Sequence, residues 1–415
     1  MQKNKEDFME KFISFIGIFV FLGICYLISE NKKKVRFKLV FAGIIIQFIF
    51  AFLILKTSIG KITFEKLSDF ITAILGFTKN GSEFLFGGLV NNVDSFGYIF
   101  AFQVLPTIIF FSSLMAVLYY LGVMQFLIRH IANFMAKTLG TSGAESLSAA
   151  ANIFVGQTEA PLIVKPYIEK MTRSELHSVM VGGMATVAGS VMAGYIGMGI
   201  SSAHLLSASI MSAPAAFVAA KIIVPETEEP ITKGNVNCEV EKLDKNVIDA
   251  AARGASEGLQ MALNVGAMLI AFVAIIAMLN AGLEGIGHLV GINGLNFENV
   301  LGYICAPFAY IMGIPSQDML TAGSLIGQKT VINEFVAYSN LSTFIKQGTL
   351  NPRTVTILTY ALCGFANFSS IAVQLGGIGE LAPKRRSEIA QLGIKALIGG
   401  TVASFLTACI AGILI

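Results

Sequence analysis

The sequence predicts an all-α polytopic membrane protein with eight transmembrane helices, two re-entrant hairpins in an inverted repeat, and additional interfacial helices. The prediction depends on the composition, on the length of the apolar stretches, and on two similar segments in the two halves of the chain. Of the 415 residues, 54% are hydrophobic and only 13% are charged, whereas a soluble domain carries roughly 25% charged residues. This composition excludes a disordered chain and a disulfide-linked scaffold. The net charge of +3 is too small to indicate a nucleic-acid partner.

Eight stretches have the length and hydropathy of membrane-spanning helices, which need about 20 apolar residues each. The sixth is longer than a bilayer requires, so we expect its first turns, with Asp249 and Arg253, to project into water or to pack against protein. The predicted spans are residues 12–29, 39–55, 98–122, 177–198, 205–224, 247–283, 354–375 and 389–414.

Three further apolar stretches are predicted to lie in the membrane interface. Residues 62–77 alternate apolar and polar side chains at helical spacing, as expected of a helix lying in the interface plane. Residues 126–139 have a similar pattern, with Arg129 and Lys137 on the polar side. Residues 300–313 are short and contain a proline, so we expect them to be interfacial too.

Lysine and arginine in short loops predict the orientation in the membrane. Basic residues gather in residues 31–38, 165–173 and 384–386. With eight spans, all three clusters fall on the cytoplasmic side if both termini lie outside. The long polar loop 225–249 is then a cytoplasmic linker between the two halves of the chain.

Two regions of the chain resemble each other. The first reads L-G-T-S-G-A-E-S-L-S-A-A-A-N-I-F-V-G-Q-T-E-A (139–160), and the second reads M-G-I-P-S-Q-D-M-L-T-A-G-S-L-I-G-Q-K-T-V-I-N-E-F (312–335). Each is followed by a span with a shared G-x-A, at 183–185 and 364–366. On the predicted topology the copies enter from opposite sides, which is the inverted repeat common in secondary transporters.

The repeat suggests a division of the chain and a place for two hairpins. The segments 146–166 and 319–338 are interrupted by glycine and polar residues, so they suit re-entrant hairpins around a protein-lined cavity. We divide the chain into a scaffold part (1–125), a first repeat (126–224), the linker (225–249), a central long helix on the scaffold side (250–298) and a second repeat (299–415).

The hairpin tips carry the candidate chemistry. Glu159 follows Gln157 in the first tip, and Glu334 lies in the second. A charged residue at membrane depth costs roughly 2.5–3.5 kcal/mol, so it usually faces a functional cavity. Asn367 and Ser370 interrupt a span at the matching depth of the repeat. Amides, hydroxyls and carboxylates suit a neutral solute that bears hydroxyl and amide groups. The alternative is that the two acids only cap hairpin turns.

An enzyme is not predicted. The chain contains no G-x-S-x-G, H-E-x-x-H or P-loop motif. Its five cysteines are scattered without a C-x-x-C pair, so a disulfide framework is not predicted either. We expect no organic cofactor and no catalytic residue.

Several segments resemble the signature segments of concentrative nucleoside transporters, in particular the bacterial eight-span members. The resemblance covers residues 12–414, and its segments occur in the family's order. They are N-I-F-V-G-Q-T-E-A-P-L (152–162), K-T-V-I-N-E-F-V-A-Y (329–338) and C-G-F-A-N-F-S-S-I (363–371), with S-E-F-L-F-G-G-L-V (82–90), F-Q-V-L-P-T-I-I-F-F (102–111), A-L-N-V-G-A-M-L-I-A-F (262–272) and L-A-P-K-R-R (381–386).

The resemblance implies a homotrimer with an elevator-like transport domain, and it implies a role for individual residues. Gln157, Thr158, Glu159 and Val191 would bind the nucleobase. Glu334, Phe365, Asn367 and Ser370 would bind the ribose side of the nucleoside. The implied Na+ ligands are the side chains of Asn152 and Thr186 and the backbone carbonyls of Val155 and Val187.

The sequence therefore predicts a symporter of the cytoplasmic membrane that imports nucleosides, such as uridine or adenosine, together with Na+. Its expected partners are nucleosides, Na+, the lipid bilayer and two further copies of the chain. Two alternatives stay open at this point. The same fold could couple to a proton, with Glu159 or Glu334 as the carrier. A membrane protein of another class could sense a nucleoside, or act as a gate that a nucleoside controls, without net transport.

Overall fold

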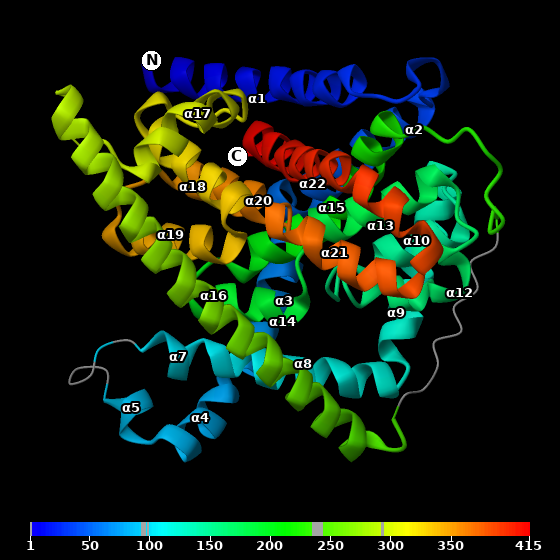
Figure 1. The fold of residues 1–415 in the computed structure, drawn as a ribbon, viewed down its shortest axis with the longest axis horizontal. Coiled ribbons are helices and arrows are strands. Elements are labelled where there is room, and N and C mark those ends of the chain that lie inside the picture. The colour runs from blue at the N-terminus through cyan, green and yellow to red at the C-terminus, as the bar shows by residue number, and fades with distance from the viewer. Residues whose placement is uncertain (1, 93–96, 98, 235–243, 292–293) are drawn as a thin grey trace.

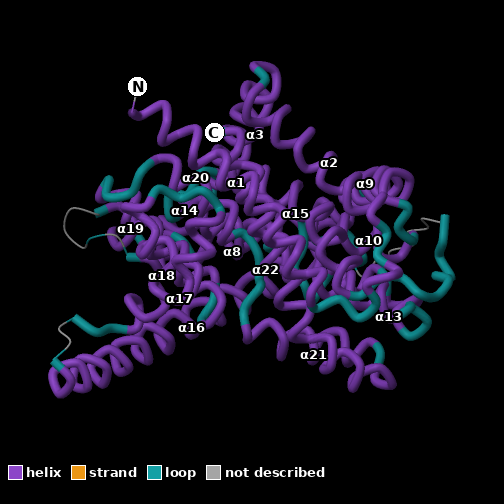
Figure 2. Tube along the Cα trace, turned by 90° about the horizontal axis from the view of Figure 1, so that it is seen from above, coloured by secondary structure: helices purple, strands orange, loops and turns teal. Residues whose placement is uncertain are grey.

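The structure, a computed structural model, describes residues 2–92, 97, 99–234, 244–291 and 294–415. Residues 235–243 of the predicted linker and residue 98 of the third predicted span lie outside the described residues. Throughout the described part of the chain the secondary structure is helical (Figure 2).

The first half of the chain contains fourteen described helices, which are listed here with their bounds: α1 (Gln2–Leu27), α2 (Phe37–Lys56), α3 (Ser58–Gly76), α4 (Thr78–Phe86), α5 (Gly88–Asn91), α7 (Phe100–Gln103), α8 (Leu105–Tyr120), α9 (Val123–Leu139), α10 (Gly143–Ala151), α11 (Ala160–Ile163), α12 (Lys165–Ile168), α13 (Arg173–Ala185), α14 (Gly189–Gly197) and α15 (Ser202–Ile223). The second half follows with α16 (Val247–Val290), α17 (Phe297–Ile311), α18 (Met319–Val331), α19 (Glu334–Gln347), α20 (Pro352–Leu362), α21 (Phe368–Leu381) and α22 (Arg386–Leu414).

Three of the eight predicted spans are each built from two helices. The predicted span 98–122 contains α7 and α8, which count together as one apolar crossing. The predicted span 177–198 consists of α13 and α14, which still count together as one apolar crossing, and the span 354–375 is split into α20 and α21. By length and hydropathy, seven helices of the described residues could cross a membrane, where the sequence predicts eight. They are Asp7–Leu27, Phe37–Lys56, Phe100–Tyr120, Arg173–Gly197, Ser202–Ile223, Val247–Leu289 and Pro383–Leu414.

The core lies around α22, which packs against α1, α13, α15 and α20 (Figure 1). Small residues allow these helices to approach closely, and both α15 and the combined α13 and α14 are almost entirely buried. The long helix α16 is different, because little of its apolar span is buried. It crosses the face of the molecule diagonally in Figure 1 and packs on α8.

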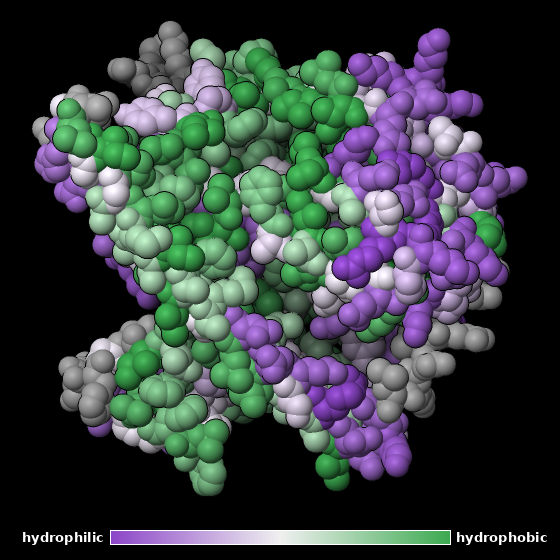
Figure 3. Space-filling model, viewed as in Figure 1, coloured by the Kyte–Doolittle hydropathy of each residue, from purple (hydrophilic) through white to green (hydrophobic). Residues whose placement is uncertain are grey.

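The three predicted basic clusters lie at one end of the molecule. Arg173, at the start of α13, pairs with Glu30 beyond α1 (2.9 Å) and with Glu388 in α22 (3.4 Å). Arg385 donates a hydrogen bond to the carbonyl of Ile168 at the end of α12 (3.1 Å). Polar residues gather at this end of the molecule, on the right of the view in Figure 3. The predicted orientation requires all three basic clusters to lie on the same side of the membrane, and they do lie at the same end of the molecule. Which side of a membrane this end faces stays a prediction.

Both hairpins and all three predicted interfacial stretches contain helices. In the first hairpin, α10 ends before the tip and the return limb is made of the single-turn helices α11 and α12, each with a proline in its first turn. In the second hairpin, α18 and α19 meet at Ile332 and Asn333. The three stretches fall in α3, α9 and α17, and their depth in a membrane stays a prediction.

Candidate functional site

Two helix breaks face each other at the centre of the molecule. Residues 186–188 separate α13 from α14, and residues 363–367 separate α20 from α21. The backbone N–H of Phe365 donates to the carbonyl of Thr186 (3.1 Å). Gly364 has φ +150°, and a Cβ there would lie 2.9 Å from the carbonyl oxygen of Met184. Glycine thus allows the second break to pack directly against the first.

The second hairpin tip brings Glu334 to these breaks. Glu334 is the first residue of α19, whose N-terminus is capped by the side chain of Asn333. Its carboxylate is buried and accepts hydrogen bonds from Asn367 Nδ2 (3.0 Å) and from the hydroxyl of Tyr195 (3.1 Å). Tyr195 comes from α14, and the sequence reading missed it. One carboxylate therefore joins the second tip to the broken helices of both repeats.

The first hairpin tip reaches the same place through Gln157. Its Nε2 donates to Ser370 Oγ (3.0 Å), and its Oε1 accepts from Gln374 Nε2 (3.1 Å). Gln374, also missed from the sequence, donates to the carbonyl of Met180 (2.9 Å) as well. Asn367 caps α21 through Ser370 N (2.9 Å). A buried chain of polar groups thus runs from Gln374 to Glu334 and contains four of the predicted site residues.

The other predicted base-binding residues lie apart from this chain. Glu159 is exposed and lines a cavity of about 550 Å³ beside α8 and α16. Arg253, Glu257, Gln260 and Asn264 form the polar wall of that cavity at helical spacing along α16. Thr158 is exposed and Val191 is buried in the apolar core. Phe365, which is predicted to bind on the ribose side, is half-buried within the second break.

The predicted sodium ligands come from the end of α10 and from the first break, and Gly182 of α13 connects the two places, because a Cβ on it would lie 3.4 Å from Asn152 Nδ2. Asn152 caps the C-terminus of α10 and is fully buried, and neither polar atom of its amide has a hydrogen-bond partner among the described residues. A buried amide left unpaired costs roughly 1–3 kcal/mol. The Thr186 hydroxyl donates to the carbonyl of Gly182 (2.9 Å), which leaves its lone pairs available. Val155 and Val187 are buried. Amide, hydroxyl and carbonyl oxygens are the donors that a hard cation prefers, so these residues fit Na+.

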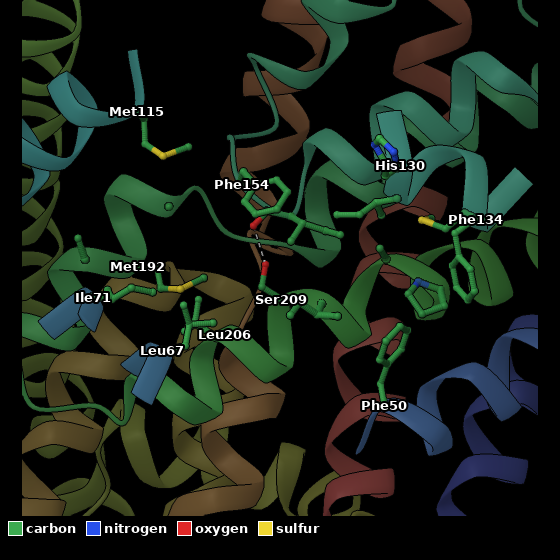
Figure 4. A pocket seen from close by; sticks show the side chains of 18 of the residues that line it. Phe50, Leu67, Ile71, Met115, His130, Phe134, Phe154, Met192, Leu206 and Ser209 are labelled. Atoms are coloured by element: carbon green, nitrogen blue, oxygen red, sulfur yellow. Dashed lines mark hydrogen bonds between the residues drawn. The ribbon is translucent and has the colours of Figure 1, made fainter. Parts of the chain in front are cut away.

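A second cavity, of about 540 Å³, is apolar (Figure 4). Phe50, Leu67, Phe134 and Met192 are among the side chains that point into it. The hydroxyl of Ser209 in its wall donates to the carbonyl of Ile153 (2.9 Å). This lining offers little for hydrogen bonding to a nucleoside, so the polar chain between the tips is the better candidate site.

Comparison with known proteins identifies the family. The family model described as "Na+ dependent nucleoside transporter C-terminus" matches residues 204–412, just over half of the chain. The corresponding N-terminal model matches residues 16–89, and a model described as "Nucleoside recognition" matches residues 101–202. The chain belongs to the concentrative nucleoside transporter family. The family consists of transporters rather than enzymes, as the absence of catalytic motifs predicts.

Relatives of this family are similar along the whole chain. The uncharacterized transporter YutK of Bacillus subtilis is 49% identical over 401 residues, which is 96% of this chain and 98% of YutK. Sodium/nucleoside cotransporter 1 of Rattus norvegicus is 44% identical over 420 residues, 98% of this chain and 64% of the rat protein.

Solved structures of the transporter CNTnw have the same fold. An inward-facing, substrate-bound structure superposes with a TM-score of 0.92 at 47% identity and covers 97% of each chain. An outward-facing structure of a CNTnw variant superposes with a TM-score of 0.95 at 47% identity, covering 98% of this chain and 99% of CNTnw.

Proposed function

We propose that the chain is a secondary active symporter that imports nucleosides across the cytoplasmic membrane together with Na+. The observation that carries the proposal is the buried polar chain that connects Gln157 at the first tip with Glu334 at the second. Its amides, hydroxyls and carboxylate are the groups that pair with a base edge and with ribose hydroxyls. The Na+-dependent nucleoside transport named by the family models supports the same function.

The polar chain also suggests how a nucleoside is accommodated. Gln157 and Ser370 bond to each other, and so do Asn367 and Glu334. A nucleoside between the tips would replace these bonds with bonds of its own, so that no buried group is left unpaired. Base contacts are proposed for Gln157, Thr158, Glu159 and Val191, and ribose contacts for Glu334, Phe365, Asn367 and Ser370.

Sodium is proposed to bind at Asn152, Val155, Thr186 and Val187. The unpaired amide of Asn152 supports this site, because an ion there would supply the missing interaction. The ion would link the end of α10 to the end of α13, next to the nucleoside site. One cation moving down a potential of 100 mV supplies about 2.3 kcal/mol, enough for roughly fifty-fold accumulation.

Transport is proposed to follow an elevator-like movement of the repeats (126–224 and 299–415) against the scaffold parts (1–125 and 250–298). Alternating access is supported by the CNTnw structures in inward-facing and outward-facing states. The exposed apolar length of α16 is proposed to contact lipid or the other subunits of a homotrimer. Both termini would then lie outside, and the linker in the cytoplasm.

Uptake into proteoliposomes tests the function. Radiolabelled uridine and adenosine should accumulate with an inward Na+ gradient and not with choline. Thr186→Val keeps the side-chain shape and removes the hydroxyl, so half-maximal uptake should need about tenfold more Na+, as expected for a lost bond to a charged group. Uptake driven equally by an inward proton gradient would favour proton coupling, with Glu159 as the exposed candidate carrier. Nucleoside binding without any uptake would favour a sensor.

A further inference from the structure

Lys329 is a buried cation for which the proposed transport mechanism has no role. It lies in the last turn of α18 and is fully buried. Its ammonium donates to the carbonyl oxygen of Ala361 (2.9 Å) and to Ser404 Oγ (3.2 Å). Among the described residues no carboxylate lies within 4.0 Å of this nitrogen. The Glu334 carboxylate attracts this ammonium from a greater distance, but a buried charge is expensive, so its oxygen ligands must be well placed.

These oxygens lie at the C-terminal end of a half-helix. Ala361 belongs to the last turn of α20, which ends at Leu362. The Ser404 hydroxyl in turn bonds to the carbonyl of Cys363 in the break (3.0 Å). The last carbonyls of a helix have no partner within the helix and carry the negative end of its dipole. Such ends of broken helices bind the coupling ions in inverted-repeat transporters.

The same arrangement occurs in the first repeat, without a lysine. There α10 is the first helix of the hairpin and α13 the first half-helix of the broken span, as α18 and α20 are in the second repeat. Asn152 at the end of α10 lies against Gly182 in the last turn of α13, whose carbonyl accepts the Thr186 hydroxyl, and Na+ is proposed to bind there. Lys329 at the end of α18 meets the end of α20.

We propose that Lys329 is a tethered cation that occupies, in the second repeat, the position that Na+ takes in the first. The inference extends the proposed function and rests on it. The second hairpin is then held permanently to α20, whereas the first is held to α13 only when Na+ is bound. One free Na+ accompanies each nucleoside, because the second ion position is already filled by the protein.

Two variants separate the charge from the volume of this side chain. Lys329→Ala leaves room for a small cation at the end of α20, and Lys329→Met fills a similar volume without charge. Melting temperatures of the purified proteins are measured against NaCl, with choline chloride balancing the ionic strength, and against propylammonium chloride. Propylammonium matches the part of the lysine side chain that alanine lacks.

The melting temperature of the wild type should rise with NaCl concentration as expected for one Na+ binding site, and it should not change with propylammonium. Lys329→Ala should respond more steeply to NaCl than the wild type and should be stabilised by propylammonium. Lys329→Met should show the one-site NaCl response and no propylammonium response. If the alanine and methionine variants respond alike, Lys329 does not stand for an ion and the proposal is overturned.

A measurement on the wild type needs no variant. Charge movement and uridine uptake in the same proteoliposomes should give one elementary charge per uridine. A larger ratio means that a second free ion is carried and overturns the proposal. A wild type without any response to Na+ contradicts the sodium coupling itself, whereas the propylammonium response of Lys329→Ala still tests the lysine separately.

Discussion

At Glu334 two donors from different repeats meet one carboxylate. The Tyr195 hydroxyl and Asn367 Nδ2 each bond to a different oxygen of Glu334. The Oδ1 of Asn367 is already used to cap α21. The Asn367 side chain therefore cannot turn over to offer an acceptor without losing the cap.

Glu334→Gln should weaken nucleoside binding about ten- to hundred-fold. The glutamine offers one oxygen in place of two, and its NH2 group would face either the Asn367 donor or a ribose hydroxyl that needs an acceptor. Lost bonds to charged groups are worth roughly 1.5–3 kcal/mol. Calorimetric titration with uridine measures the loss. Tyr195→Phe is the matched control and removes a single donor, so its loss should be smaller. Uridine affinity at the wild-type level in the glutamine variant would show that Glu334 does not bind the ribose.

Sequence patterns could predict four members of the polar chain but not the hydrogen bonds that connect them. Gln157, Glu334, Asn367 and Ser370 stand out because they are polar residues at membrane depth in repeat-matched segments. Tyr195 has the profile of an interfacial or core aromatic residue, and nothing in its neighbourhood distinguishes it. Gln374 is a lone amide in the apolar stretch of α21 and could have been found as such.

Helix breaks are the elements that hydropathy alone does not resolve. The predicted spans 177–198 and 354–375 have nearly continuous hydropathy, yet both are interrupted in the structure. The signals are local: Asn367 is an N-cap for α21, and Thr186 ends α13 in an extended conformation. One backbone bond, from Phe365 N–H to the Thr186 carbonyl, joins the two breaks, whereas the carbonyl of Cys363 accepts from Ser404 in its own repeat. Contacts between segments so far apart in the chain do not follow from the pattern of a single sequence.

Glu30 joins helices at the end of the molecule where the three basic clusters lie. The bonds of this carboxylate make the stability of the protein depend on pH. Glu30 accepts bonds from Arg173 Nη2 (2.9 Å) and from Lys395 Nζ (2.7 Å), and so links the α1–α2 connection to α13 and α22. The bond from Arg173 lowers the pKa of Glu30 from 4.5 to about 2. Because the folded-state pKa is depressed, this contribution to stability is complete above pH 4.5 and is lost as the pH falls toward 2.

Glu30→Gln should therefore destabilise the protein at pH 7 and much less at pH 3. The pairs are partly exposed, so each contributes about 0.2–1 kcal/mol. Melting temperatures of wild type and variant at the two pH values measure the difference. Glu228→Gln changes an exposed acid of the linker. The difference in melting temperature between this variant and the wild type should therefore be the same at pH 7 and at pH 3. An equal effect of Glu30→Gln at pH 7 and pH 3 would contradict the role of this carboxylate.

At the scale of the whole molecule, the repeat places both hairpin tips against one pair of helix breaks. The similarity to CNTnw covers nearly the whole chain, so the arrangement belongs to the family fold. The repeat could be recognised in the sequence because its two copies keep the same order of glycine, acid, small residues and polar tip, and its inversion across the membrane stays a prediction. The placement of Glu159 in a cavity beside α16 could not be predicted from the sequence, because it depends on the packing of distant segments.

Two tips that hold opposite ends of one solute should reject either half of it. A free base would displace the Gln157–Ser370 bond and leave Ser370 unpaired, and it would make none of the ribose bonds to Glu334, which are worth roughly 1.5–3 kcal/mol each as bonds to a charged group. Ribose alone would leave Gln157 Nε2 unpaired. Each unpaired buried group costs roughly 1–3 kcal/mol, so a free base should compete at least about a hundred-fold less well than its nucleoside. Competition against radiolabelled uridine uptake by uracil, adenine, ribose, uridine and adenosine measures this difference. A free base that inhibits as well as its nucleoside would mean that the second tip does not bind the sugar and that the transported solute is a nucleobase.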